Sequence, residues 1–150
     1  MSRFAVDIMA EFDRLLLSGP LQHAGRWQAV YAVFPEFTGF SGHFPDYPLM
    51  PALMQVLLAQ HFVGKVCGEP GELLDISVAK FTGQIRPGDR VAVSAALLSS
   101  GEAESVWNFK LYSSGVENPA INPPFDPEKT DGWTQAAGFR LGFRTGAGDA

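Results

Sequence analysis

The feature that most constrains the fold is an apolar segment over residues 51–66. Only Gln55, Gln60, His61 and Lys65 interrupt its run of hydrophobic and small residues. The length and composition predict a helix that begins at Pro51 and ends before Gly68. A helix that is apolar on nearly all sides must be buried on nearly all sides. The rest of the chain must therefore provide a surface that surrounds this helix.

A β-sheet is the predicted surface, because the second half of the chain is rich in strand-forming residues. Strands are expected at 26–34, 73–85, 91–98, 106–112 and 133–143. An amphipathic helix over 3–17 is predicted to precede them, with Ser18-Gly19-Pro20 ending it. One buried helix followed by several long strands is an α+β pattern. A chain of 150 residues is long enough for one core, so we expect a single domain over 1–150.

The remaining segments are predicted to be connections. Residues 37–48 contain two glycines and two prolines, which favours a loop. Residues 115–132 contain four prolines and several charges, which indicates a Pro-rich insertion without strands. Residues 144–150 are mostly small, and we expect a mobile tail there.

Composition excludes several classes of function. The net charge is −5 with no basic run, which disfavours binding to nucleic acid. Cys67 is the single cysteine, so no intrachain disulfide forms and a reducing cytoplasm is the expected location. The three histidines lack the spacing of metal ligands, so we expect neither a metal nor another cofactor. No secretory signal and no membrane span are expected, because charges interrupt every apolar run.

Three groups of residues occur in an order that resembles a known enzyme family. The first is Gly42-His43-Phe44-Pro45 followed by Pro48-Leu49-Met50-Pro51, and the second is Ala59-Gln60. The third joins Ala79-Lys80-Phe81 to Ile85-Arg86-Pro87-Gly88-Asp89. Together they resemble the 3-hydroxyacyl-[acyl-carrier-protein] dehydratases of the FabA/FabZ type, over roughly residues 30–115. The resemblance implies a hotdog fold, in which an antiparallel sheet wraps around a long central apolar helix.

The resemblance also implies an active site. His43 matches the family histidine that removes the proton next to the thioester carbonyl, a task that suits an imidazole. Backbone amides near Pro51 and Ala52 match the donors that polarise the thioester carbonyl at a helix start. The other residues expected to contact substrate are Gly42, Phe44, Met50, Leu57, Gln60 and Phe81.

One catalytic residue of the family is missing from this sequence. The family carries an Asp or Glu six positions after the proline that opens the helix, and here that position is Leu57, or Val56 if the alignment gap lies earlier. No Asp or Glu occurs from Tyr47 to Gly68. His61, Asp46 and Glu36 are candidate substitute acids, although a histidine on an apolar helix favours a buried structural role for His61.

The sequence therefore predicts an acyl-thioester protein similar to FabZ, acting on 3-hydroxyacyl chains carried by acyl carrier protein or coenzyme A. The loss of the carboxylate predicts impaired dehydration. Two alternatives remain open: an acyl thioesterase, and a non-catalytic acyl-binding or partner subunit. The family implies a homodimer, with a trimer of dimers or a heterodimer with a carboxylate-bearing paralogue as further arrangements.

Overall fold

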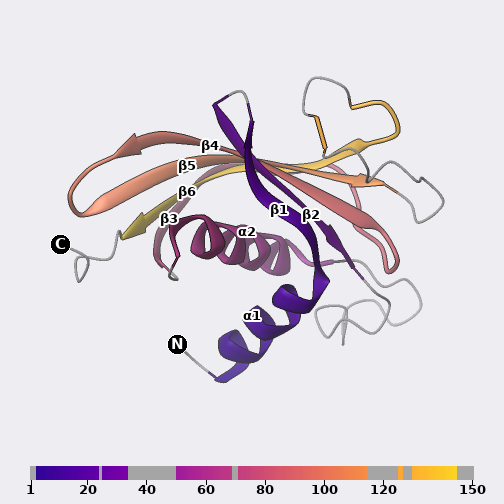
Figure 1. Ribbon diagram of the computed structural model, residues 1–150, viewed down its shortest axis with the longest axis horizontal. Coiled ribbons are helices and arrows are strands. Elements are labelled where there is room, and N and C mark those ends of the chain that lie inside the picture. Colours follow the sequence, from indigo (N-terminus) through magenta and orange to yellow (C-terminus); the bar gives the residue numbers. More distant parts are fainter. Residues whose placement is uncertain are drawn as a thin grey trace.

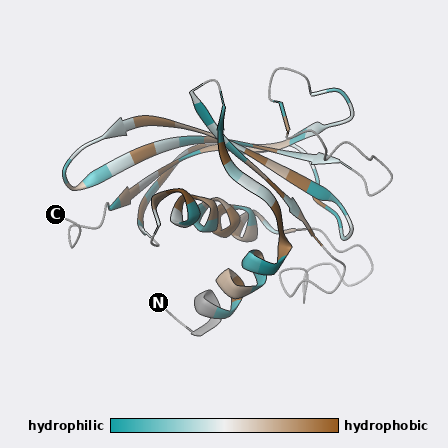
Figure 2. Cartoon of the chain, in the orientation of Figure 1, coloured by the Kyte–Doolittle hydropathy of each residue, from teal (hydrophilic) through white to brown (hydrophobic). Residues whose placement is uncertain are grey.

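A single long helix, α2 (Ala52–Cys67), lies beneath a curved antiparallel sheet in the computed structural model (Figure 1). The structure describes residues 3–23, 25–33, 50–68, 71–114, 125–126 and 130–144. Helix α2 is hydrophobic over most of its length (Figure 2), and its buried residues include Met54, Leu58, Ala59 and Phe62. Gly68 ends the helix in a left-handed conformation, with φ 86°. The predicted helix over 51–66 is thereby confirmed.

Six strands form the sheet. They are β1 (Leu16–His23), β2 (Arg26–Ala32), β3 (Glu72–Phe81), β4 (Arg90–Ser100), β5 (Glu104–Ser114) and β6 (Thr134–Arg144). Their order across the sheet is β1-β2-β4-β5-β6-β3, and every neighbouring pair is antiparallel. The predicted α+β hotdog fold, a sheet wrapped around a central helix, is confirmed.

The core lies between α2 and the inner face of the sheet. Alternate residues of each strand point inward, as the two-residue period of a strand requires. On β5 these are Trp107, Phe109 and Leu111, and on β6 they include Phe139 and Leu141, all in one buried cluster. Phe62 of α2 meets Phe109 edge to face, with ring centroids 6.2 Å apart. The helix is therefore held by aromatic packing against the middle of the sheet.

The N-terminal prediction is correct in its first part and wrong at its end. Helix α1 (Arg3–Leu15) buries Ile8, Phe12 and Leu15, which recur at helical spacing. The helix stops two residues before the expected 17, and strand β1 follows at once where no strand was predicted. Glycine at position 19 allows β1 to lie close to β2, because its φ is 88° and a Cβ there would lie 2.5 Å from the carbonyl oxygen of Gln28.

Strand β3 also differs from the prediction. It ends at Phe81 instead of continuing to residue 85, because the chain turns away to reach Ile85, which is fully buried. The Ile85 carbonyl accepts a hydrogen bond of 2.8 Å from the Met50 amide. This bond ties the segment after β3 to the residues that lead into α2.

A second, smaller cluster lies on the outer face of the sheet. Val30, Ala92 and Tyr112 point outward and are covered by Phe125, which belongs to the predicted Pro-rich insertion over 115–132. The Phe125 ring lies 5.0 Å from that of Tyr112 and 5.2 Å from that of Trp133. Phe125 is 2% exposed, so it anchors this segment to the sheet. The mobile tail predicted over 144–150 is wrong at its first residue, because Arg144 ends β6 and pairs with both β3 and β5. Residues 145–150 lie outside the described part of the chain.

Within the described residues, neither helix combines the length and the hydrophobicity that crossing a bilayer requires.

Candidate active site

The start of α2 presents backbone donors at the surface. Pro51 occupies the N-cap position in an extended conformation, and no side chain of the described residues caps the helix. Ala52 and Leu53, the first two helical residues, are exposed. The first amides of any helix lack partners within the helix and carry the positive end of its dipole. This end of α2 can therefore donate hydrogen bonds to an oxygen that gains negative charge.

Met50, just before the helix, shapes the inner side of this region. Its side chain is 4% exposed, and its carbonyl accepts a hydrogen bond of 3.2 Å from the buried Gln55 side chain. Two polar contacts thus fix the backbone at Met50: the one from Gln55 and the one between its amide and Ile85. A backbone held on both sides keeps the helix start in one position, as an oxyanion site requires.

Leu57 and Val56, the two candidate positions of the missing acid, face different ways. Val56 is buried in the core, whereas Leu57 is half-buried. Leu53, which is 61% exposed, precedes Leu57 by one turn, and half-buried Gln60 follows it by three residues. These three residues form a stripe along the accessible side of α2. A side chain at position 57 therefore reaches the surface of the subunit, and one at position 56 does not.

Gln60 and Phe81 each contact a neighbouring segment of the chain. The Gln60 amide nitrogen donates a hydrogen bond of 3.1 Å to the Gly71 carbonyl, which links α2 to the start of β3. Phe81, at the end of β3, is 40% exposed and stacks on Phe139 with centroids 5.8 Å apart. Phe81 thus offers one open ring face beside the sheet edge, whereas the Gln60 nitrogen already has a partner.

His61 belongs to a buried network that joins both helices to β2. Its Nδ1 lies 2.8 Å from the Tyr31 hydroxyl and its Nε2 lies 2.7 Å from Oδ1 of Asp13. The Asp13 carboxylate also binds Lys65 at 2.7 Å. Asp13 is ionised and only accepts, so Nε2 carries the proton and Nδ1 accepts from Tyr31. Both ring nitrogens are occupied, which confirms the expected buried structural role.

The charges in this network follow from its surroundings. Burial lowers the pKa of His61, and the hydrogen bond to Asp13 opposes that shift only in part. The hydrogen bonds from Lys65 and His61 lower the pKa of Asp13. Burial raises the pKa of Tyr31. The imidazole therefore stays neutral between a neutral phenol and a carboxylate, and it is a poor substitute acid.

Other predicted site residues fall outside the described part of the chain. These are Gly42, His43, Phe44, Asp46 and Glu36, all within the segment 34–49. Among the described residues, no group of three His, Cys, Asp or Glu side chains lies close enough together to hold a metal ion.

Sequence reasoning missed the partners of His61 and the exposure of β3. Asp13 is 48 residues and Tyr31 30 residues from His61 along the chain, so no local pattern connects them. The only hint was a polar residue on an otherwise apolar helix. Strand β3 exposes Leu74, Ile76 and Val78 at the sheet edge, and its alternating apolar residues were consistent with either an edge or an interior strand.

Solved structures with the same fold include dehydratases and thioesterases. The dehydratase heterocomplex ApeI:P from Xenorhabdus doucetiae aligns with a TM-score of 0.56 and 16% identity, over 85% of this chain and 93% of that one. Thioesterase superfamily member 2 from Mus musculus aligns with a TM-score of 0.59 and 14% identity, over 89% and 90% of the two chains. At these identities the likeness establishes the fold alone.

Sequence comparisons are more specific. The 3-hydroxyacyl-[acyl-carrier-protein] dehydratase FabZ of Ralstonia nicotianae is 34% identical over 112 residues, which cover 68% of this chain and 65% of the relative. The FabZ of Rhizobium leguminosarum is 32% identical over 77 residues, 47% of this chain and 48% of the relative. The chain thus spans less than two thirds of the length of these curated relatives. The model of the ApeI-like family, described as ApeI dehydratase, matches residues 21–120. Because that match extends over more than half of the 150-residue chain and includes α2, the chain belongs to the ApeI-like dehydratase family.

Proposed function

We propose that this chain is a FabZ-like subunit that binds 3-hydroxyacyl thioesters of acyl carrier protein or coenzyme A in the cytoplasm. The observation that carries the proposal is the start of α2, where Ala52 is exposed and no described side chain caps the helix. This helix start directly follows the predicted His43 loop. Family membership and the FabZ relatives give the reaction class, the removal of water.

The proposed reaction begins at the carbon next to the thioester carbonyl. His43 takes a proton from that carbon, and negative charge moves to the carbonyl oxygen. Amides at Ala52 and Leu53 stabilise this oxygen through hydrogen bonds and the helix dipole. The double bond then forms as the β-hydroxyl departs, and the hydroxyl must receive a proton to leave as water. No redox or metal cofactor takes part in this scheme.

Protonation of the departing β-hydroxyl is the step that this chain is least able to catalyse. Leu57 stands at the accessible position where the family has a carboxylate, and its side chain can neither give nor take a proton. Removing one partner of a concerted acid–base pair slows a reaction by about 10²–10⁴-fold. We therefore propose that this chain dehydrates slowly by itself, or that another subunit supplies the acid.

Dimerisation through β3 is part of the proposal. Strand β3 lies at one edge of the sheet and exposes Leu74, Ile76 and Val78, which are 38%, 46% and 66% exposed. An open apolar edge strand is a template for pairing with another chain. A homodimer satisfies this edge, and so does a heterodimer with a carboxylate-bearing paralogue. A trimer of dimers is compatible with the same contact.

The test is turnover of a 3-hydroxyacyl thioester by the purified protein and three variants. Leu57→Glu restores a carboxylate at the accessible position, and His43→Ala removes the proposed base. Leu98→Glu is the matched control, because it places the same charge on an exposed leucine of β4, away from the start of α2. We expect Leu57→Glu to raise dehydration by at least about tenfold and Leu98→Glu to leave it unchanged.

Three results separate the readings. Wild-type dehydration that disappears in His43→Ala means that the site works with an acid from elsewhere. Activity gained only in Leu57→Glu means a dehydratase scaffold that has lost its acid. Tight acyl-thioester binding without turnover in any variant would refute the dehydratase proposal and favour an acyl-binding subunit.

The second candidate is a catalytic partnership with a paralogue, favoured by the outward position of Leu57. Co-purification with a carboxylate-bearing paralogue, and activity that depends on His43 of this chain, would support it. Release of free acid without dehydration would instead identify a thioesterase. Mass measurement in solution tests the interface: Ile76→Lys on β3 should convert a dimer into a monomer.

A further inference from the structure

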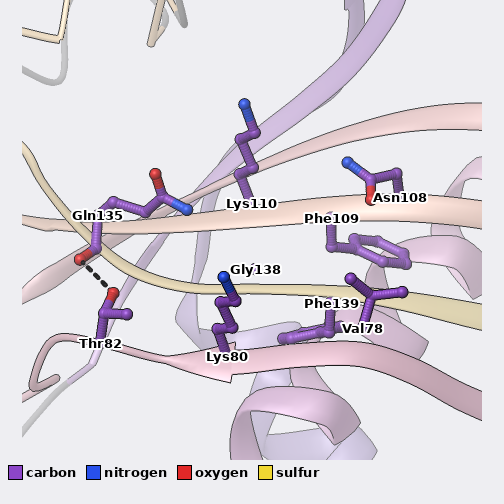
Figure 3. Close-up of a pocket in the computed structure, with 9 residues that line it drawn as sticks. All are labelled: Val78, Lys80, Thr82, Asn108, Phe109, Lys110, Gln135, Gly138 and Phe139. Atoms are coloured by element: carbon purple, nitrogen blue, oxygen red, sulfur yellow. Dashed lines mark hydrogen bonds between the residues drawn. The ribbon is translucent and has the colours of Figure 1, made fainter.

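A hollow on the outer face of the sheet, opposite the side that holds α2, is lined by two lysines and by no carboxylate of the described residues. It has a volume of about 230 Å³ and is lined by Lys80 of β3, Lys110 of β5 and residues of β6 that include Gln135 and Gly138. Figure 3 shows Lys80 and Lys110 extending on the same side of the sheet, with Asn108 and Gln135 beside them. The lysine ammonium groups and the Asn108 amide can donate hydrogen bonds to an anion. Val78, Phe109 and Phe139 also line the hollow, and the Gln135 nitrogen donates to the Ala137 carbonyl at 3.4 Å.

The register of the sheet creates the hollow. Gly138 pairs with Lys80 on one side and with Lys110 on the other, so the two lysines flank a position that has no side chain. Neighbouring strands lie about 4.8 Å apart, which places the two lysine backbones roughly 10 Å from each other. A Cβ at Gly138 would lie 3.4 Å from the Gln135 amide nitrogen, an ordinary contact. Glycine is therefore not required by the backbone here, and its effect is to leave space.

Strain in β3 aims Lys80 at this space. A β-bulge between Ser77 and Lys80 adds one residue, so that Ser77 pairs with Arg140 while Lys80 pairs with Gly138, two residues away on the same face. Without the bulge, Lys80 would point toward the core. Within the bulge, Val78 has a φ of 49°, which is a strained value for a β-branched residue. Such strain costs about 1–3 kcal/mol and is typical of functional positions.

The charge on this face is uncompensated. Across the described residues, neither lysine is within ion-pair distance of a carboxylate, although the whole chain carries a net charge of −5. Arg140, on the next row of the same face, adds a third positive charge. Arg140 lies on β6, between the strands that carry the two lysines, so the positive charges gather on one face. A bound anion would balance part of this charge.

We propose that the hollow over Gly138 binds a phosphate group, either free or as a phosphate ester. A dianion with several acceptor oxygens matches two ammonium groups and the neighbouring amides better than a single carboxylate does. The hollow lies on the face opposite the proposed acyl site. Pairing through β3 would extend the sheet and leave this outer face open, so the proposal does not depend on the proposed activity.

The test is a titration of the isotopically labelled full chain with inorganic phosphate and, separately, with 4′-phosphopantetheine, followed by amide NMR at constant ionic strength. We expect saturable shifts at Lys80, Lys110 and Gly138. Lys80→Gln and Lys110→Gln should each weaken binding about fivefold. Gly138→Val keeps both charges but fills the space, and it should abolish the shifts. Arg14→Gln on α1 is the control for loss of one charge, and it should bind normally.

Tighter binding of 4′-phosphopantetheine than of inorganic phosphate would identify an ester as the ligand, and equal binding would identify the free anion. Either result supports the site when the lysine and Gly138→Val variants lose it. Shifts of equal size in the Lys80→Gln/Lys110→Gln double variant, or no saturable shift in the wild type, would overturn the proposal. The spectrum of each variant without ligand verifies that it is folded.

Discussion

Removing one oxygen atom, in Tyr31→Phe, tests whether the buried His61 network stabilises the fold. The Tyr31 ring meets the rings of Phe12 and His61 with centroids 6.4 Å and 5.6 Å away, and phenylalanine keeps both contacts. Only the hydrogen bond of 2.8 Å to His61 Nδ1 is lost. The substitution therefore separates the polar interaction from the packing.

The expected cost follows from what His61 is left with. Its ring is 5% exposed and its Nε2 is held by Asp13, so the ring cannot turn Nδ1 toward water. A buried acceptor without a partner costs about 1–3 kcal/mol. We expect Tyr31→Phe to lower the free energy of unfolding by that amount. For a chain of this size the melting temperature should fall by about 2–4 °C for each kcal/mol.

Urea unfolding followed by circular dichroism measures this change. Tyr112→Phe is the matched control, because Tyr112 is 8% exposed and no hydrogen bond of its hydroxyl occurs within the described residues. The control should stay within about 0.5 kcal/mol of the wild type. Adding His61→Leu should cost less in Tyr31→Phe than in the wild type, since no unpaired hydroxyl remains. Equal stability of Tyr31→Phe and its control would refute the reasoning.

Three other predictions concern stability. Burial lowers the pKa of His61, so the unfolded chain binds the proton more readily than the folded chain does. The free energy of unfolding should therefore fall as the pH drops below 6.5, which urea midpoints measured over a pH series would show. His61→Gln should flatten this part of the series. Gly19→Ala should destabilise by about 1–3 kcal/mol in thermal unfolding, because its new Cβ meets the Gln28 carbonyl oxygen, and an unchanged melting temperature would contradict the close approach. By calorimetry, Phe62→Ala should lower the free energy of unfolding by about 3–5 kcal/mol and Leu53→Ala by less than about 1 kcal/mol. The Phe62 side chain is fully buried, whereas Leu53 is 61% exposed. Similar losses in the two variants would contradict a core that contains Phe62 and excludes Leu53.

The parts of the fold that sequence predicted are those with a local cause. The helix over 51–66 was predictable because its composition is apolar and Gly68 follows it. Strand β1 was missed because Ser18-Gly19-Pro20 is typical of a break. Pairing with β2 supplies the hydrogen bonds that outweigh this local preference. Strand β1 therefore forms because it pairs with β2, and a local sequence pattern does not reveal that pairing.

The candidate site divides in the same way. The helix start at Pro51 was predictable, since proline at a helix entrance is a local rule. The opposite directions of Val56 and Leu57 emerged only from packing, because an almost wholly apolar helix gives no periodic sign of its exposed side. The partners of His61 required folding over 30 and 48 residues.

The contact between Phe125 and the sheet shortens the effective loop length of the connection between β5 and β6. The attachment of Phe125 to the sheet divides the chain between Ser114 and Thr134 into two shorter stretches. The entropy of closing a loop grows only with the logarithm of its length, so either half can gain or lose residues at a cost of a few tenths of a kcal/mol. An insertion or deletion on one side of Phe125 should therefore leave its contact with the sheet unchanged, so that Phe125 separates two stretches whose lengths can change independently.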